Sequence, residues 1–310
     1  MVANIPSLPT PKVIDAPVAR HEKMGARAIR PFLLRLQHGI TASKTSSVPS
    51  LRQCKNRIVD QSFESLIAEA ETAPIVGWNF DWLNGRATEE RPSWEYSRLL
   101  AERYRQADKV LDLQSGSGEM LAALPHLPAL LVATEGYRPN LTLAAQRLRP
   151  RGVHVVGTDD RHELLPFSDA VFDLVTSRHP VTTWWKEIER VLRPGGSYLS
   201  QQVGPNSLRE LSEYIMGPSL KGSARHPRLA EQQAADVGLV VTDLREERLR
   251  TVFYDVGAVV YFLRLVIWIV PNFSVERFRD RLWSLHQQIE REGHYVAHAS
   301  RFLIEACKAR

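Results

Sequence analysis

The chain has 310 residues, 44% of them hydrophobic and 24% charged, which is an ordinary composition for a soluble globular protein. This length allows one large domain or two small ones. The two cysteines, Cys54 and Cys307, lie far apart and outside any metal-ligand spacing. The sequence therefore predicts neither a disulfide framework nor a metal site, and it favours a reducing compartment.

The net charge of +5 lies entirely in the first 50 residues, which hold seven Lys and Arg side chains against Asp15 and Glu22. The rest of the chain is neutral, which argues against nucleic-acid binding because that function needs a basic face on the folded domain. The leader also lacks the continuous apolar core of a secretory signal. We expect residues 1–55 to form a basic, poorly ordered extension of a cytoplasmic protein, with an organelle-targeting segment as the alternative.

The predicted elements begin with a helical pattern over residues 62–71, an aromatic stretch, GWNFDWLNGR, and a helix that starts near Pro92. From residue 109 onward, short apolar runs alternate with helical patterns. This alternation is typical of βαβ units around a parallel sheet whose strands are covered on both faces. Strands are predicted at 109–113, 129–134, 152–157, 171–177 and 195–203, with helices at 118–124, 139–148 and 184–192.

Beyond Gly204 the pattern is less regular. A helical pattern over 206–216 and a strand within 238–253 precede a final strand at 300–307. The residues between these last two strands predict a helical lid inserted before the last strand. Its apolar run VGAVVYFLRLVIWIVP is interrupted by an arginine and is shorter than the roughly 20 apolar residues that a membrane span needs. We therefore expect a buried helix or a cavity lid there, and no membrane span.

The candidate site begins with VLDLQSGSGEML, residues 110–121, which predicts a buried strand, a turn of small residues and the start of a helix. Gly116 and Gly118 let the backbone turn sharply and approach a ligand closely. One strand later, the Glu135 carboxylate is able to accept both hydroxyls of a ribose. A dinucleotide or S-adenosylmethionine would suit this loop, but Leu121 stands where the dinucleotide fingerprint has its third glycine.

Together with LLPFSDAVFDLV and RVLRPGG, these motifs resemble the class I S-adenosylmethionine-dependent methyltransferases that act on small molecules. The likeness covers about 109–203 in the expected order, and the aromatic prelude and SRFLIEA extend it over about 63–306. It implies an α/β fold with a Rossmann-like, seven-stranded, mostly parallel sheet and helices on both faces. The implied methyltransferase domain is 56–310, with a cofactor core at about 105–205 and a substrate and lid region at about 206–300 plus 60–100.

The resemblance implies a role for each matching residue. Glu135 would bind the ribose hydroxyls, and the segment Asp159–Arg161 would contact the adenine. Ser177 to His179 would face the methyl group, with His179 as the candidate general base. The implied cofactor-binding residues are Asp112, Gln114, Ser115, Gly116, Gly118, Glu135, Asp159, Asp160, Arg161 and Ser177.

Gln114 departs from the resembling family, whose loop often has its first glycine at this place. The backbone angles of that glycine cost a larger residue on the order of 1 kcal/mol. We expect Gln114 to lower the affinity for the cofactor rather than to abolish binding.

The predicted function is the transfer of a methyl group from S-adenosylmethionine to an oxygen, nitrogen or carbon atom of a small-molecule acceptor. One alternative is a non-catalytic copy of the fold that acts through a partner. A second is a nucleic-acid methyltransferase, although SRHP stands where enzymes that methylate base amino groups generally carry N/D-P-P-Y/F/W. An NAD-dependent dehydrogenase comes last, because the third glycine is missing.

Overall fold

The computed structural model describes residues 62–75, 77–78, 80–159, 163–218 and 225–310. All of them belong to one compact unit, Ile58–Arg310. The predicted N-terminal extension, 1–55, lies outside the described residues, as do Asp160 and Arg161 of the predicted adenine contact. The proposed limits of the methyltransferase domain stay a prediction.

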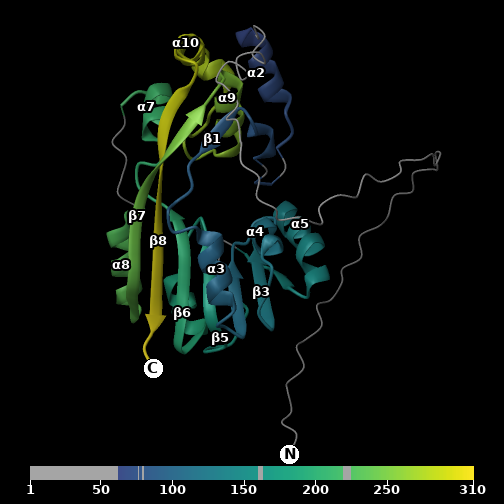
Figure 1. The fold of residues 1–310 in the computed structure, drawn as a ribbon, viewed down its shortest axis with the longest axis vertical. Helices are drawn as coiled ribbons and strands as arrows, with labels where there is room; N and C mark the ends of the chain where they lie inside the picture. The colour runs from purple at the N-terminus through teal and green to yellow at the C-terminus, as the bar shows by residue number, and fades with distance from the viewer. Residues whose placement is uncertain (1–61, 76, 79, 160–162, 219–224) are drawn as a thin grey trace, which may run out of the picture. The chain divides into compact units, whose positions relative to one another are not determined.

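The described residues form a sheet in the order β1-β7-β8-β6-β5-β2-β3-β4 (Figure 1). The five strands from β6 to β4 pair in parallel, whereas β8 runs antiparallel to β6 and β7. The predicted α/β fold with a mostly parallel sheet is confirmed. The strands are β2 (Lys109–Leu113), β3 (Leu130–Glu135), β4 (His154–Gly157), β5 (Phe172–Arg178), β6 (Leu192–Val203), β7 (Leu239–Phe253) and β8 (Tyr295–Lys308).

The sheet has eight strands, so the predicted number of seven is wrong. The additional strand is β1 (Ala87–Glu89), which pairs antiparallel with Thr251–Phe253 at the end of β7. A strand of three residues is too short to show the alternation of apolar and polar residues by which strands are predicted. The other seven strands are those that the sequence predicted.

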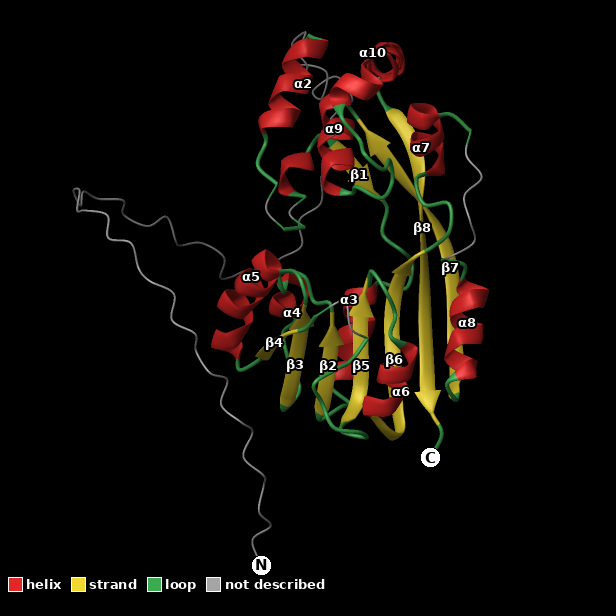
Figure 2. Cartoon of the chain, turned by 180° about the vertical axis from the view of Figure 1, so that it is seen from behind, coloured by secondary structure: helices red, strands yellow, loops and turns green. Residues whose placement is uncertain are grey.

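Helices cover both faces of the parallel strands, as predicted (Figure 2). Neighbouring residues of β2 show why: Val110 belongs to the apolar cluster packed on one face and Leu111 to the cluster on the other. Because side chains of a strand alternate between faces, both faces of β2 are buried. The helices of this part are α3 (Tyr96–Tyr104), α4 (Glu119–Ala123), α5 (Arg138–Leu148), α6 (Trp185–Val191) and α8 (Pro227–Asp236), with a 3-10 turn at Arg149–Arg151.

Strands β7 and β8 run beyond the parallel strands (Figures 1 and 2). A third apolar cluster includes residues at these ends of the two strands. The accessory lobe is the name that we give to the described residues of α2, β1, α7, α9 and α10, the connection between α9 and α10, and the adjoining ends of β7 and β8. The predicted helical insertion before the last strand is confirmed as α9 and α10. The bounds are α2 (Phe63–Thr72), α7 (Arg209–Met216), α9 (Val256–Leu265) and α10 (Val275–Glu292), with a 3-10 turn at Asp81–Leu83.

Most residues of α9 are buried, which explains its apolar sequence. No helix within the described residues is long and apolar enough to cross a membrane. Arg86 fixes the aromatic prelude to this lobe. Its guanidinium pairs with Asp255 at 2.8 Å and with Glu69 at 2.9 Å, and it lies 4.0 Å from the centroid of the Trp82 ring.

Candidate functional site

The glycine loop, residues 114–118, connects β2 to α4. Gly116 and Gly118 have positive φ angles of 60° and 77°, which glycine adopts without a steric penalty. A Cβ atom on Gly118 would lie 2.7 Å from Cδ1 of Leu148, so the helix α5 packs directly against the loop there. The sequence prediction of a sharp turn that needs glycine is therefore supported at both positions.

Glu135 ends β3 and joins that strand to the glycine loop. Its Oε2 accepts a hydrogen bond from the N–H of Gly116 at 2.7 Å, and its Oε1 accepts one from the N–H of Tyr137 at 2.8 Å. The side chain is buried. Glu135 thus lies beside the loop, as a residue that binds a ribose between β2 and β3 must.

Asp112 is buried near the end of β2 and is turned toward the protein interior. Its carboxylate accepts hydrogen bonds from the hydroxyls of Ser115 and Thr176, each at 2.6 Å. Burial raises the pKa of Asp112 to about 6, although both hydroxyl bonds act to lower it. In this structure Asp112 and Ser115 fix the loop to β5.

Gln114 adopts the left-handed backbone conformation with a φ of 54°. This was expected, because the resembling family often has a glycine at this place. Its side chain does something that the sequence did not reveal. The Oε1 atom accepts from the N–H of Val181 at 2.7 Å, and Nε2 donates to the carbonyl of Thr182 at 2.8 Å. Gln114 therefore bridges the glycine loop to the segment that follows β5.

Ser177 and His179 were both expected to face the methyl group. The Ser177 hydroxyl is buried in a network with Tyr198 at 2.8 Å and Ser200 at 2.9 Å, and its role beside the methyl group stays a prediction. His179 has a φ of 54°, and its N–H donates to the carbonyl of Gln201 at 2.7 Å.

The protonation state of His179 follows from its neighbours. Trp94 Nε1, which can only donate, bonds Oε1 of Gln201 at 2.8 Å. The amide nitrogen of Gln201 is therefore the atom that lies 2.9 Å from Nε2 of His179, and the imidazole Nε2 accepts. Burial first, and then the charges of Arg178, Arg301 and Arg225, hold the pKa of His179 well below its usual value. The ring is neutral, with its proton on Nδ1.

The segment after β4 borders the same edge of the sheet. The N–H of Thr158 donates to the carbonyl of Glu135 at 3.2 Å. Asp159, the next residue, is exposed. Its predicted contact with adenine stays a prediction.

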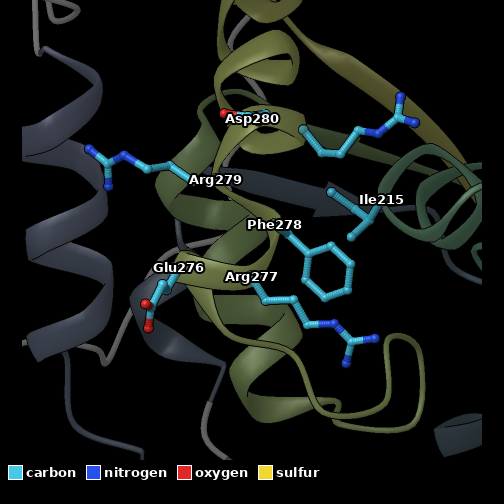
Figure 3. A pocket seen from close by; sticks show the side chains of 7 residues that line it. Ile215, Glu276, Arg277, Phe278, Arg279 and Asp280 are labelled. Atoms are coloured by element: carbon cyan, nitrogen blue, oxygen red, sulfur yellow. The ribbon is translucent and has the colours of Figure 1, made fainter.

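The described part of the chain has pockets in at least two places. One, of about 280 Å³, borders the segment Pro180–Thr183 that Gln114 holds. The other, of about 300 Å³, lies beside the start of α10 and includes none of the predicted site residues (Figure 3). Figure 3 shows Phe278 and Ile215 close together, with Arg277 and Arg279 pointing in different directions around them. The two arginines of this pocket point away from each other. In ligand-binding pockets, by contrast, a few polar groups converge on one place.

Comparison with known proteins identifies the region that contains this site. Residues 111–200 match the model of a family described as a methyltransferase domain. This region is a class I S-adenosylmethionine-dependent methyltransferase domain. The predicted family is thereby confirmed, and with it S-adenosylmethionine as the cofactor of the domain. The glycine loop, Glu135 and His179 all lie within the matched residues.

Two curated relatives share part of the methyltransferase domain. Malonyl-[acyl-carrier protein] O-methyltransferase from Marinomonas sp. is 30% identical over 149 residues, which cover 43% of this chain and 54% of that protein. Demethylmenaquinone methyltransferase from Chlorobaculum tepidum is 26% identical over 106 residues, which cover 32% and 43%. The chain spans about half the length of the curated relatives it matches. Among solved structures, the YcgJ protein from Bacillus subtilis aligns with a TM-score of 0.48 and 17% identity, covering 69% of this chain and 98% of that one.

Proposed function

We propose that this protein transfers a methyl group from S-adenosylmethionine to a small-molecule acceptor. The observation that carries the proposal is the hydrogen bond from the N–H of Gly116 to the Glu135 carboxylate. It brings an acidic residue and a glycine loop together at the carboxyl ends of β2 and β3, where open α/β sheets bind their ligands.

The residues present fit the cofactor. Gly116 and Gly118 adopt the left-handed backbone of a tight turn, which a side chain would strain, and Glu135 would supply the carboxylate for the ribose hydroxyls. When bound, S-adenosylmethionine offers a sulfonium-borne methyl group that an acceptor lone pair attacks in line while the sulfur–carbon bond breaks. The protein's main contribution is to hold the two reactants in that alignment.

His179 is suited to positioning rather than to removing a proton. Its Nε2 lone pair already accepts from Gln201, and its Nδ1 carries the proton. A neutral imidazole in this state donates one hydrogen bond, which orients an acceptor oxygen or nitrogen beside the methyl group. The expected general-base role would require the Gln201 contact to break first, because a protonated ring would place two N–H groups against each other.

A small-molecule acceptor is favoured over a nucleic acid because the chain beyond residue 50 carries no net positive charge. The names of the two relatives refer to malonyl-acyl carrier protein and to demethylmenaquinone, two different acceptors. They support methyl transfer without indicating one common acceptor.

Calorimetric titration with S-adenosylmethionine and S-adenosylhomocysteine, followed by a labelled-methyl screen against a metabolite extract, tests the proposal. We expect both ligands to bind and label to appear in a small molecule. Lack of binding would refute the proposal. Binding with no labelled product would favour the non-catalytic alternative, and RNA binding that falls steeply with salt would favour a nucleic-acid substrate.

A further inference from the structure

Large apolar side chains remain exposed in two segments, one of which borders the glycine loop. Two of them, Trp78 and Phe80, belong to the aromatic prelude, and two more, Ile267 and Trp268, belong to the connection between α9 and α10. Exposed apolar groups that gather in one place commonly mark a binding site. The carboxyl edge of a parallel sheet is also where such a site is expected.

Trp78 and Trp268 contact each other above the loop. Their ring centroids lie 5.4 Å apart, with the ring planes inclined at 63°. A Cβ atom on Gly116 would lie 3.8 Å from Cδ1 of Trp78, so this indole borders the glycine loop itself. Two segments that are far apart in the sequence therefore bring one aromatic pair to the edge of the cofactor site.

This pair differs from the aromatic pairs that stabilise the accessory lobe. Trp82 stacks on Tyr261 with centroids 4.7 Å apart, and Tyr261 is buried. Trp78 and Trp268 remain 38% and 47% exposed although they touch each other. Packing of the lobe leaves these indole surfaces uncovered, so a ligand has room to contact them.

We propose that Trp78 and Trp268 bind the methyl acceptor and that the acceptor carries a planar, apolar ring. This inference rests on the function proposed above. A flat ring meets one indole face to face and the inclined indole edge to face, and both contacts are favourable. A saturated group of the same size gains only the burial of its apolar surface.

The test uses 2-naphthol as a planar probe and decahydro-2-naphthol as its saturated counterpart. Both are titrated into the full-length protein saturated with S-adenosylhomocysteine. The variants are Trp268→Ala, Trp268→Leu, which keeps apolar volume, and Trp283→Ala. Trp283 is a matched control, because it also lies in the accessory lobe, is 46% exposed, and contacts Phe63 edge to face.

We expect the wild type and Trp283→Ala to bind 2-naphthol alike and to prefer it over the saturated probe. Both Trp268 variants should bind 2-naphthol about tenfold more weakly, because the stacking partner is lost. All four proteins should bind S-adenosylhomocysteine equally.

Three results would overturn the inference. In the first, the wild type binds no 2-naphthol, or binds the saturated probe equally well. In the second, both Trp268 variants bind 2-naphthol as tightly as the wild type does, or Trp283→Ala weakens the binding of 2-naphthol as well. In the third, loss of Trp268 weakens S-adenosylhomocysteine binding, which would assign the pair to the cofactor. A wild type that fails to bind S-adenosylhomocysteine would instead refute the proposed function, so the two failures are distinguishable.

Discussion

Buried or partly buried aspartates at the two edges of the parallel sheet have pKa values that are shifted in opposite directions. At the amino edge, Asp173 near the start of β5 accepts the N–H groups of Lys109 at 2.8 Å and Asp108 at 2.9 Å, and it pairs with Arg193. Burial acts to raise the pKa of Asp173, but these contacts outweigh it and the pKa is lowered. At the carboxyl edge, Asp112 bonds two hydroxyls, and burial raises its pKa to about 6.

The backbone shows a related difference. Left-handed residues occur at both edges, and at the amino edge Gly152 and Ala170 lie in the turns that lead into β4 and β5. At the carboxyl edge, Gln114 and His179 adopt the same strained region, and their side chains bond neighbouring segments. The edge whose left-handed residues bond neighbouring segments and whose carboxylate is poorly solvated has the properties of a functional site, whereas the other edge has those of a structural one.

The largest effect on ligand binding is expected at Glu135, the acidic residue of the carboxyl edge. Glu135→Ala should weaken S-adenosylhomocysteine binding by about 10- to 100-fold, because hydrogen bonds to a charged group contribute roughly 1.5–3 kcal/mol. Calorimetric titration measures this. Glu135→Gln, which keeps the side-chain length, should lose less. Unchanged affinity in a folded Glu135→Ala protein would remove the ribose assignment.

Substitution of the two aspartates should shift stability in opposite directions. The folded pKa of Asp112 lies above its unfolded value of 3.8, so its favourable contribution is present below pH 3.8 and is lost as the pH rises through 6. Asp112→Asn should therefore stabilise the apo protein by up to about 3 kcal/mol at pH 7.5, and the gain should vanish near pH 4. The pKa of Asp173 is lowered, so its contribution is present at neutral pH and is lost on acidification.

Urea unfolding at pH 4.5, 6 and 7.5 measures both aspartate variants. Asp173→Asn should destabilise the protein at pH 7.5 and do so less in acid. If Asp112→Asn lost stability at pH 7.5, the carboxyl edge would not bear the electrostatic cost that distinguishes it from the amino edge.

Two glycine substitutions distinguish the energetic cost of a packing clash from the cost of a left-handed backbone. Gly118→Ala should lower the free energy of unfolding by about 2 kcal/mol, because the new Cβ meets Leu148 at 2.7 Å in addition to the cost of a φ of 77°. Gly152 at the amino edge has a φ of 81° and nothing within 4 Å of an added Cβ. Gly152→Ala should cost only about 1 kcal/mol, so equal losses in the two variants would contradict the close packing of α5 on the glycine loop.

His179 should show a smaller effect, on turnover alone. As a positioning donor, its replacement by Ala should lower kcat about tenfold and leave S-adenosylhomocysteine binding unchanged, since one hydrogen bond contributes roughly 1 kcal/mol. The pH profile of the wild type should have no acidic limb near pH 6.5, because the pKa of His179 lies well below that value. A 10²- to 10⁴-fold loss together with such a limb would favour a general base instead.

The sequence predicted the parts of this molecule that local patterns encode. The glycine loop and Glu135 belong to short motifs that follow strands, and the structure has them side by side. The helix α8 was not predicted, although Pro227 at its start and Gly238 after its end are the signals that mark helix limits.

The contacts that decide the chemistry of the site join residues far apart in the sequence. Gln114 and Val181 are 67 positions apart, and Trp94 and Gln201 are 107 positions apart. Neither pair forms a periodic pattern, and a glutamine at either place has no preferred partner in its own segment. For this reason the bridge from Gln114, and the Gln201 amide that fixes the imidazole of His179, could not be predicted.

The smallest effect is expected at Gln114, where two contributions oppose each other. Gln114→Gly relieves the left-handed backbone, which is worth about 1 kcal/mol, and it removes two hydrogen bonds of roughly 0.5–1.5 kcal/mol each. The Val181 and Thr182 groups of this bridge are near solvent, so water replaces part of the loss. The free energy of unfolding should change by less than about 1 kcal/mol. Gln114→Ala loses the bridge and keeps the strain, so it should be about 1 kcal/mol less stable than the glycine variant.

Hydrogen exchange at the Val181 N–H reports the bridge independently of stability. Both Gln114 variants should lose protection there, while protection of the Leu111 N–H in β2 stays unchanged. S-adenosylhomocysteine affinity should also stay within a fewfold of the wild type, because the amide of Gln114 is turned toward the segment after β5. If Gln114→Gly instead tightened binding strongly, the side chain would be an obstacle in the cofactor site, and the carboxyl edge would carry an eroded loop rather than a working one.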